Sequence, residues 1–472
     1  MKRAALLLAA AALLGAAGAS LYVLTSQGVP PRTLGPYIEQ RSLNHNPTIE
    51  TIGRTANAWL MHMDRGPLAT RAEGAWTVGA KPSGARPMGT LTVTGAVGSV
   101  RQLQRAIGAA NPGDVITLLP GTYRVTGSGL KTNRAGREGA PITLRGSAGV
   151  VIESTARAAM TIDGPWWRIE HLTVKGVCAD DTVCEHAFHV TGGASHFTAT
   201  NNTISDFNAH VKINGSGGRF PDHGLLESNT LNNSRARKTR NPVTPIDLVG
   251  ASNWIIRHNL ISDFLKDGGD RISYGAFAKG AGTDNLFERN IVICEWRLQR
   301  APGQRVGLSL GGGGTGPQFC RDRRCIVEQE RSILRDNLIA SCSDDGVYLN
   351  NAAASRLEHN TLVDTGGVTV RFAGSSAVLS GNLVDGAIRA RDGGALDADD
   401  NLETAIAARY LGRHPWRSVF RKAEALDLRW RDEEPGRRSV PATNAIDLCG
   451  TTRPAAPVYG AFENFSACLG SP

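Results

Sequence analysis

Residues that could do chemistry recur at two positions of a repeating pattern that reads apolar, variable, apolar, variable, small. Successive side chains of a β-strand point to opposite faces, so both variable positions would face outward. The first outward position holds, in chain order, His189, Lys212, Asp247, Phe277, Ser309, Tyr348, Arg371 and Arg389. The second holds Thr191, Asn214, Val249, Lys279, Gly311, Asn350, Ala373 and Arg391. Stacked repeats would align these side chains in two columns on one face.

Such columns suit a polyanionic sugar chain. Lysine and arginine bind carboxylate or sulfate, and Phe277 or Tyr348 could pack against a sugar ring. β-Elimination at a uronate needs a group that neutralises the carboxylate, a base for the C5 proton and an acid for the leaving oxygen. Lysine, tyrosine, histidine and arginine can fill these roles when neighbours tune their pKa values. The alternative is an ordinary solvated face.

Asparagines mark the elements that would position the columns. They follow one another at intervals of 22 to 31 residues, with one longer step of 47 residues that contains an insertion from Gly312 to Arg331. An inward asparagine at a bend can bond the backbone and its equivalents in neighbouring coils. This spacing predicts a helical coil of short parallel strands. The asparagines are Asn202, Asn229, Asn259, Asn290, Asn337, Asn360 and Asn382.

The composition agrees with a repetitive all-β architecture. The chain of 472 residues contains 55 glycines and only 6% aromatic residues, which favours many short elements joined by tight turns. Near the start of the repeats, Val100, Leu103, Ile107 and Ala110 have helical spacing and precede a strand at 115–119. We expect that helix to cover the open end of the stack.

Four regions follow from these patterns. Residues 1–24 form a signal peptide or an uncleaved anchor, because two basic residues precede an apolar run and small residues. Residues 25–97 form an irregular extension with one short helix near 50–63. Residues 98–394 form the repeats, and residues 395–472 pack beside the last coils. We therefore expect a periplasmic or secreted protein, and a monomer, whose only membrane contact would be that anchor.

Eight cysteines and a net charge of +9 bear on compartment and partners. In an exported chain an even cysteine count is compatible with disulfides. The pairs Cys178/Cys184, Cys320/Cys325 and Cys449/Cys468 are close in sequence, which leaves Cys294 and Cys342 for a fourth; the pairing itself stays open. Zinc is disfavoured by these spacings. The positive charge favours an anionic partner, such as acidic polysaccharide, lipid headgroups or nucleic acid, or else serves general solubility; of these partners we expect acidic polysaccharide and no nucleic acid.

Two segments resemble known β-helix proteins. The stretch SVRQLQRAIGAANPGDVITLLPGTYRV (99–125) and the coil Ile272–Asn290, which has a lysine at the end of a strand, resemble pectate-lyase-like right-handed parallel β-helices. The resemblance spans about 98–394 and is nearest to the chondroitinase-B and alginate-lyase type. It implies an all-β solenoid and identifies Lys279 as the candidate base.

The sequence departs from that family where its catalytic apparatus would lie. Ile272 and Tyr274 stand at the positions of the family's calcium-binding acids, and Arg305 is out of register with its arginine. No cofactor is therefore assigned; calcium stays an alternative without its expected ligands. Glycines at 311–314 predict close approach of a ligand or loop to the backbone, and the Cys320/Cys325 loop could lie there.

We therefore predict a lyase or C5-epimerase acting on acidic polysaccharide. Lys279 would be the base, Tyr348 the proton donor and Arg371 the carboxylate clamp. The substrate-binding candidates are His189, Lys212, Asp247, Phe277, Asn350 and Arg389.

Two alternatives remain. One is a non-catalytic polysaccharide-binding or structural β-helix of the cell envelope. The other is a glycoside hydrolase, since Asp344-Asp345 resembles a paired-aspartate coil, although such a pair at the start of a strand is more commonly a turn cap.

Overall fold

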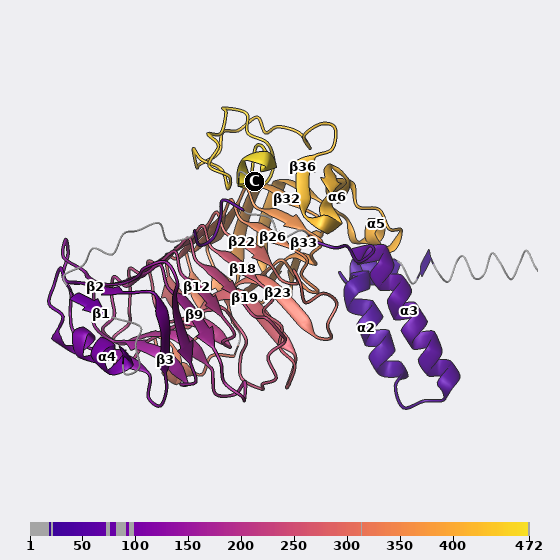
Figure 1. Ribbon diagram of the computed structural model, residues 1–472. Helices are drawn as coiled ribbons and strands as arrows, with labels where there is room; N and C mark the ends of the chain where they lie inside the picture. The colour runs from indigo at the N-terminus through magenta and orange to yellow at the C-terminus, as the bar shows by residue number, and fades with distance from the viewer. Residues whose placement is uncertain are drawn as a thin grey trace, which may run out of the picture.

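The computed structural model describes residues 18–19, 22–71, 76–81, 91–93, 99–312 and 314–470. Its strands are stacked as parallel coils along one axis (Figure 1). The predicted signal or anchor segment lies largely outside the described residues. Within those residues, no helix is both long and apolar enough to cross a membrane.

One face of the solenoid is a ten-stranded parallel sheet, which carries the predicted columns. Its strands, in spatial order, are β4 (Leu130–Thr132), β7 (Ala158–Ile162), β10 (His186–Thr191), β13 (Ala209–Asn214), β16 (Ile246–Val249), β19 (Ile272–Lys279), β23 (Gln304–Gly311), β27 (Val347–Asn350), β31 (Gly367–Arg371) and β33 (Ala387–Arg391).

Two further parallel ladders complete the coils. The first runs through β1 (Leu91–Val93), β2 (Val115–Leu118), β5 (Ile142–Gly146), β8 (Trp167–Glu170), β11 (Thr198–Thr200), β14 (Leu225–Glu227), β17 (Ile255–Arg257), β21 (Leu286–Glu288), β25 (Ile333–Arg335) and β29 (Ser355–Glu358). The second runs through β3 (Gly121–Val125), β6 (Val150–Ser154), β9 (Thr173–Gly176), β12 (Thr203–Ser205), β15 (Thr230–Asn232), β18 (Leu260–Ser262), β22 (Ile291–Ile293), β26 (Leu338–Ala340) and β30 (Thr361–Val363). Both join the long strands β32 (Ser376–Val384) and β34 (Ala395–Glu403), so coil stacking continues to Glu403.

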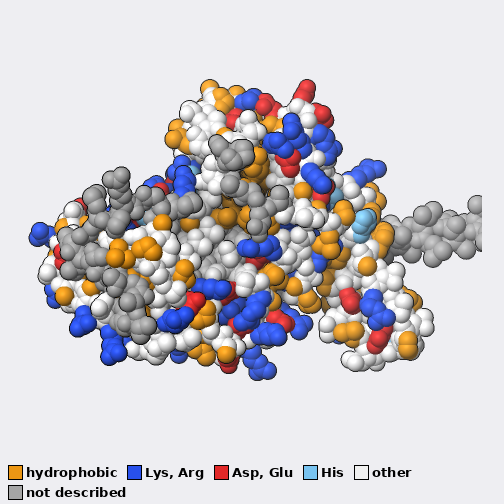
Figure 2. All heavy atoms as spheres, viewed as in Figure 1, with side chains coloured by type: hydrophobic (Ala, Val, Ile, Leu, Met, Phe, Trp, Pro, Cys, Tyr) orange, Lys and Arg blue, Asp and Glu red, His pale blue; other side chains and the backbone are white. Residues whose placement is uncertain are grey.

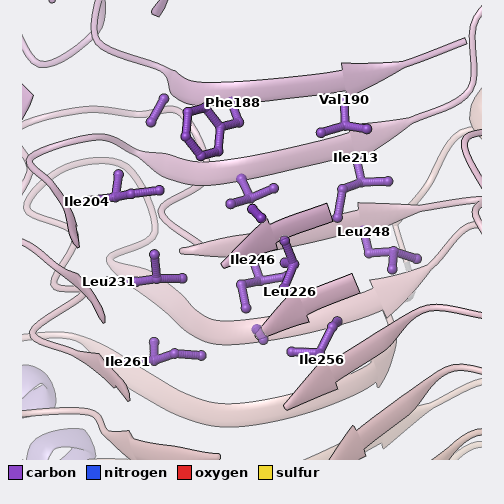
Figure 3. Packing of buried hydrophobic residues seen from close by; sticks show 14 of the residues in the cluster. Phe188, Val190, Ile204, Ile213, Leu226, Leu231, Ile246, Leu248, Ile256 and Ile261 are labelled. Atoms are coloured by element: carbon purple, nitrogen blue, oxygen red, sulfur yellow. The ribbon is translucent and has the colours of Figure 1, made fainter. Parts of the chain in front are cut away.

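The interior is an apolar stack that follows from strand alternation. Phe188, Val190 and Ile213 point inward from the ten-stranded sheet and meet Ile204 and Leu231 from another ladder (Figure 3). All five side chains are buried. Their burial on every coil provides the main favourable free energy of folding for this part of the chain.

The predicted asparagine ladder is present. The backbone N–H and side-chain amide of Asn259 both donate to Oδ1 of Asn290, at 3.1 and 3.0 Å, and Asn290 repeats this pattern with Asn337 at 3.0 Å. The ladder continues one coil further than predicted, to Asn401. Each rung satisfies backbone groups that the turn would otherwise leave unpaired.

One end of the solenoid is covered by a helix, and two further helices lie at the N-terminal side of the chain. The predicted capping helix is α4 (Ser99–Ala109), whose Leu103 and Ile107 are buried. The N-terminal extension is more ordered than predicted, because it contains α2 (Pro31–Ser42) as well as α3 (Pro47–Arg65). These helices form a hairpin beside the later coils (Figure 1).

Buried ion pairs attach this hairpin to the solenoid. Arg32 contacts Asp64 at 2.9 Å and Asp364 at 3.0 Å, and Arg65 contacts Asp364 at 3.1 Å. Arg409 completes the network with a 2.7 Å contact to Asp64. Although burial opposes ionisation, Arg32 and Arg409 hold the pKa of Asp64 well below its usual range.

The C-terminal segment packs along the side of the coils. It contains α5 (Ile406–Tyr410), α6 (Pro415–Ser418), the antiparallel pair β35 (Phe420–Lys422) and β36 (Asp427–Trp430), and short 3-10 turns η2 (Ala423–Ala425) and η3 (Phe465–Cys468). Phe420, Leu428 and Phe462 cover outward apolar residues such as Ile291 and Leu338.

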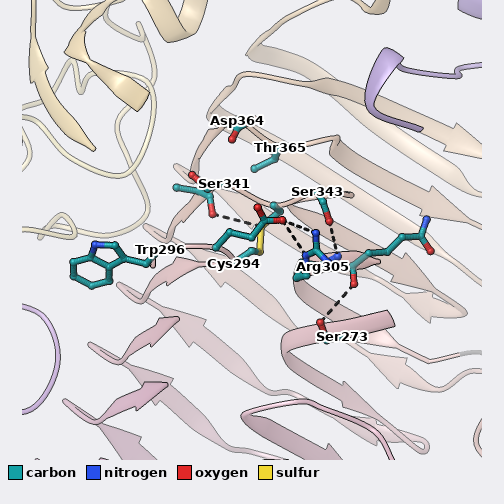
Figure 4. Close-up of a disulfide and its surroundings, with 12 residues drawn as sticks. Ser273, Cys294, Trp296, Arg305, Ser341, Ser343, Asp364 and Thr365 are labelled. Atoms are coloured by element: carbon teal, nitrogen blue, oxygen red, sulfur yellow. Dashed lines mark hydrogen bonds and ion pairs between the residues drawn. A yellow bond between two sulfur atoms is a disulfide. The ribbon is translucent and has the colours of Figure 1, made fainter. Parts of the chain in front are cut away.

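All four cysteine pairs suggested by the sequence are disulfides. Three close local loops, at Cys178–Cys184, Cys320–Cys325 and Cys449–Cys468. Cys294–Cys342 instead joins successive coils (Figure 4).

Candidate functional site

A cleft of about 750 Å³ lies over the ten-stranded sheet. Its floor consists of outward side chains of β10, β13, β16 and β19. Its walls are three loops at 215–220, 242–244 and 314–323. The candidates His189, Lys212, Asp247, Phe277 and Lys279 all line this cleft. Figure 2 shows basic and acidic side chains side by side on the face of the solenoid turned toward the viewer.

The floor bends where three glycines stack on adjacent coils. A Cβ on Gly275 would lie 2.7 Å from the carbonyl oxygen of Gly307, and one on Gly307 would lie 2.5 Å from that of Gly346. A Cβ at either position would collide with the backbone of the next coil, so only glycine fits there. The bend lets Tyr274 and Phe277, three residues apart, meet on one face with ring centroids 5.7 Å apart.

Lys279 ends β19 and extends its side chain over the cleft floor. Its Nζ lies 4.4 Å from the centroid of the Phe277 ring. Within the part of the chain that the structure describes, this ammonium has no hydrogen-bond or ion-pair partner. Burial lowers the pKa of Lys279, and the positive charge of Lys212 lowers it further, while Asp247 and Glu328 act in the opposite direction. These are the surroundings that favour a neutral amine.

Two of the predicted substrate-binding residues are already engaged with each other. Lys212 Nζ donates to Asp247 Oδ2 at 2.8 Å, so the carboxylate partly offsets the positive charge on the floor. Phe277 is only 6% exposed, and Lys279 occupies one face of its ring. It therefore supports the lysine rather than offering an open platform for a sugar.

Two histidines form the floor beyond Lys212. His189 Nε2 shares a 2.8 Å hydrogen bond with Asn214 Oδ1, and its ring centroid is 5.2 Å from that of His186. Burial lowers the pKa of both, that of His186 to about 3. Both rings are thus neutral near pH 7. No signal in the sequence pointed to His186, because it lies two residues before Phe188, where the repeat pattern of this coil begins.

Tyr274 is a second residue whose importance the sequence did not reveal. It lines the same cleft as Lys279, and burial raises its pKa to about 12. A phenol with that pKa is protonated at neutral pH and can donate a proton. The sequence placed Tyr274 on the same strand as Lys279, but this position was interpreted only as that of a missing calcium ligand.

The segment 314–323, which includes the start of the disulfide-closed loop, forms one wall of the cleft. The short turn η1 (Pro317–Phe319) directly precedes Cys320, and a Cβ on Gly312 would lie 2.5 Å from Cδ of Lys279. Arg321 follows the first cysteine of the loop. Its guanidinium pairs with Asp222 at 2.5 Å and lies 4.7 Å from the centroid of the Phe220 ring. Gly313 lies outside the described residues.

Three of the four remaining candidates line an adjoining hollow of about 280 Å³. Tyr348, Arg371 and Arg389 line it, and the N-terminal segment 28–33 forms one side. Tyr274 lines both spaces and marks where they meet. Tyr348 and Arg371 were predicted to share one site with Lys279. In the structure Lys279 lines the cleft, whereas Tyr348 and Arg371 line the adjoining hollow.

The predicted register is wrong at β31. The pairs Tyr348↔Thr369 and Asn350↔Arg371 put Thr369 in the first column and Arg371 in the second, so Ala373 is in neither. The reason is that β31 ends at Arg371 and Phe372 has a left-handed φ of 69°. Arg371 still reaches the hydroxyl of Tyr348 at 3.4 Å.

Hydrogen bonds and ion pairs order the second hollow. The amide of Asn350 donates to the Tyr348 hydroxyl at 3.3 Å; Asn350 is itself buried. Arg371 pairs with Asp392 at 2.5 Å, and Arg389 pairs with Asp345 at 2.9 Å. Asn350 therefore positions Tyr348 instead of lining the space.

The aspartate pair lies in this hollow as well. Burial, and then the neighbouring charge of Asp345, raise the pKa of Asp344 to about 6. Asp345 is committed to Arg389, and Asp344 N–H donates to the carbonyl of Arg305 at 3.1 Å. One carboxylate is thus held by an arginine, which differs from a pair of carboxylates flanking a bond to be hydrolysed.

The structure does not supply the calcium ligands or the arginine of the resembled family. The apolar side chain of Ile272 and the phenol of Tyr274 do not suit calcium, which prefers carboxylate and carbonyl oxygens. Nearby Asp270 is paired with Lys266 at 2.7 Å. Across the described ranges no group of three or more His, Cys, Asp or Glu residues is placed to hold a metal.

Arg305 is a structural residue. Its guanidinium donates to Glu295 at 2.7 Å beside the Cys294–Cys342 disulfide, and its backbone N–H donates to Ser343 at 2.9 Å (Figure 4). It is 1% exposed. Arg305 therefore cannot reach a ligand in the cleft.

Comparisons with known proteins agree with this architecture. The sequence matches the family model "Right handed beta helix region" over 186–401 and the model "Chondroitinase B" over 97–272. The second match ends before Lys279, so it does not bear on that residue. No curated protein matches the sequence significantly.

Similar solved structures include pectate lyase Pel9A, at 16% identity over 76% of this chain and 90% of that chain, with a TM-score of 0.49. An alginate lyase from Paenibacillus sp. str. FPU-7 is 17% identical over 66% of this chain and 99% of that chain, with a TM-score of 0.36. The PL6 family polysaccharide lyase Pedsa3628 from Pseudopedobacter saltans is 13% identical over 73% and 97%, with a TM-score of 0.39. These values are too low to transfer any residue role. The chain is a right-handed parallel β-helix that is similar, over its first coils, to chondroitinase B.

Proposed function

We propose that this protein is an exported enzyme that acts on uronate-containing polysaccharide by β-elimination or C5-epimerisation. The observation that carries the proposal is Lys279, whose amine has a lowered pKa and lies in a 750 Å³ cleft with a protonated tyrosine. The similarity to chondroitinase B over 97–272 supports an acidic sugar polymer as substrate. The four disulfides support export to an oxidising compartment.

Both reactions would begin with the same proton transfer. The neutral amine of Lys279 takes the C5 proton, and the electron pair is delocalised into the uronate carboxyl group. Positive charge from Lys212 and Arg321 on the cleft floor and wall would favour that intermediate. The positions of Lys279 and Tyr274 in one cleft suit a base and an acid acting on the same sugar.

The second half of the reaction distinguishes the two outcomes. In elimination, the C4–O bond breaks, its electron pair leaves with oxygen, and Tyr274 donates the proton that oxygen needs, so a C4=C5 double bond remains. In epimerisation, a proton returns to C5 from the opposite face and no bond of the chain breaks. Tyr348 and Arg371 would bind the adjoining sugar.

Lys279→Ala tests this proposal. We expect it to lose at least about 100-fold in kcat, the usual range for removal of a general base, while keeping its far-UV spectrum and melting temperature. Alginate, polygalacturonate and a glycosaminoglycan would be incubated with each protein. Absorbance from unsaturated uronate reports elimination, and the ratio of C5 epimers reports epimerisation.

The control is Arg168→Ala, which removes an exposed cation of β8, on another face of the solenoid. It should keep full activity. Normal turnover by Lys279→Ala would contradict the assignment of the base. Binding of a polymer by the wild type, without double bonds and without a changed epimer ratio, would instead identify a binding protein.

A further inference from the structure

The groove on the ten-stranded sheet is closed at one end by the chain's own N-terminal segment. Gly28, Val29, Pro30 and Thr33 line the second hollow together with strands β19, β23, β27, β31 and β33. Gly28, Arg389 and Arg391 also line another hollow, of about 580 Å³, on the far side of the segment. The segment therefore stands as a wall across β33.

This wall lies close to the sheet at Gly28, which lines both hollows together with Arg389 and Arg391. A Cβ on Gly28 would lie 3.4 Å from Cδ of Arg389, which is van der Waals contact. The wall is also held in place from behind. The hydroxyl of Tyr410 donates to the carbonyl of Val29 at 3.1 Å, and the backbone N–H of Arg32 donates to Asp64 at 2.8 Å.

The space in front of the wall is lined by three arginines, Arg371, Arg389 and Arg391, and by the carboxylates of Asp344 and Asp345. Arg389 is 13% exposed and gives one nitrogen to Asp345; its Nε and Nη1 are buried with no hydrogen-bond partner in the described structure. The guanidinium of Arg371 donates a hydrogen bond to the hydroxyl of Tyr348, with Nη1 3.4 Å from that oxygen. Buried donors without a partner are costly, and a carboxylate would satisfy them if the Arg389 guanidinium turned toward the hollow.

The distance from Lys279 to the wall is short. From β19 to β33 there are four coil steps, which at the usual strand spacing is roughly 19 Å. That length holds only a few sugar rings. A polymer that runs along the sheet from Lys279 across these coils would therefore meet the wall at β33.

We propose that the second hollow is a terminal subsite, which receives the uronate at one end of the polymer and makes the protein act from chain ends. The inference rests on the proposed function for its substrate class. Arg389 and Arg371 would bind the carboxylate of the last sugar, Tyr348 would bind a ring oxygen or hydroxyl, and the 28–33 segment would exclude a longer chain.

Binding stoichiometry tests the wall independently of catalysis. Size-fractionated chains of alginate, polygalacturonate and a glycosaminoglycan would be titrated into Lys279→Ala. We expect one protein molecule per chain whatever its length, because only one kind of end fits. A stoichiometry that grows with chain length would overturn the terminal subsite.

The sizes of the reaction products and the variant Arg389→Ala provide a second test of the terminal subsite. If the wild type eliminates, short products should appear from the first time point while the remaining polymer stays long; early fragments of intermediate length would overturn the inference. Arg389→Ala should weaken binding of a short oligosaccharide about 10- to 100-fold, as expected for a lost charge-assisted hydrogen bond, with Arg168→Ala unchanged.

The outcomes separate the two proposals. Turnover that yields intermediate fragments leaves the proposed chemistry standing and removes the terminal subsite. One protein per chain without any turnover leaves the subsite standing and removes the chemistry. Absence of both binding and turnover for all three polymers overturns both.

Discussion

At the scale of single residues, the chemistry depends on how the charges around Lys279 set the pKa of its amine. Lys212 lowers the pKa of Lys279 and Asp247 raises it, although the two are bound to each other at 2.8 Å. A base must be unprotonated to act, so activity should fall as pH drops below the pKa of Lys279. Because that pKa is lowered, activity should persist at lower pH than for an exposed lysine.

Opposite substitutions should move this profile in opposite directions. Lys212→Ala removes a neighbouring positive charge, so the pKa of Lys279 should rise and the acidic limb of kcat/KM should shift to higher pH. Asp247→Asn removes a negative charge, so the limb should shift to lower pH. Rates measured across pH 5 to 11 test this pair. Shifts in the same direction would show that another group controls the limb.

At the scale of elements, the α2–α3 hairpin is attached by charges buried at its base. Asp64 accepts from both Arg32 and Arg409, and all three side chains are buried. Removing one charge from such a set leaves the others uncompensated, which costs more than the set contributes. The same contact holds the start of the wall at Arg32, so attachment of the hairpin and shape of the groove are linked.

Asp64→Asn should therefore destabilise the protein by about 3–5 kcal/mol. The matched control is Glu50→Gln on the exposed face of α3, whose pair with Arg54 should contribute less than about 1 kcal/mol. Urea unfolding followed by tryptophan fluorescence measures both.

The direction in which this contribution to stability changes with pH follows from the pKa of Asp64. The folded-state pKa of Asp64 is depressed, so its contribution is present at neutral pH and is lost as pH falls below the unfolded value of about 3.9. Equal stability of the two variants would contradict the role of the buried set.

At the scale of the whole molecule, the solenoid is a series of coils held to their neighbours, and the Cys294–Cys342 disulfide joins two of them across 48 residues. Closing a long loop restricts the unfolded chain more than closing a short one. The Cys178–Cys184 disulfide, by contrast, spans 6 residues.

Replacing Cys294 and Cys342 by alanine should cost about 4 kcal/mol, against about 2 kcal/mol for the pair Cys178 and Cys184, on the loop-entropy relation. Thermal unfolding under oxidising and reducing conditions would measure both. Equal losses would show that local packing, not loop length, sets the contribution.

The sequence by itself determined the solenoid. Asparagine spacing and strand alternation act between adjacent coils, so the period of the chain is the period of the structure, and the ladder through Asn259 and Asn290 could be predicted. Alternation also predicted the columns as far as Asn350, because β-strand side chains must face in or out. It failed at Arg371, where the left-handed Phe372 ends the strand two residues earlier than the apolar pattern suggests.

Only the tertiary structure decided which candidates share a space. The division of Lys279 from Tyr348 and the wall at Gly28 arise from contacts between residues distant in sequence, and the pairing of Arg305 with Glu295 arises from the course of the chain between two strands. No local pattern encodes such contacts, because the N-terminal segment and the coils it contacts are more than 300 residues apart in sequence. The extent of the groove is therefore a property of the folded molecule, whereas its repeating floor is a property of the sequence.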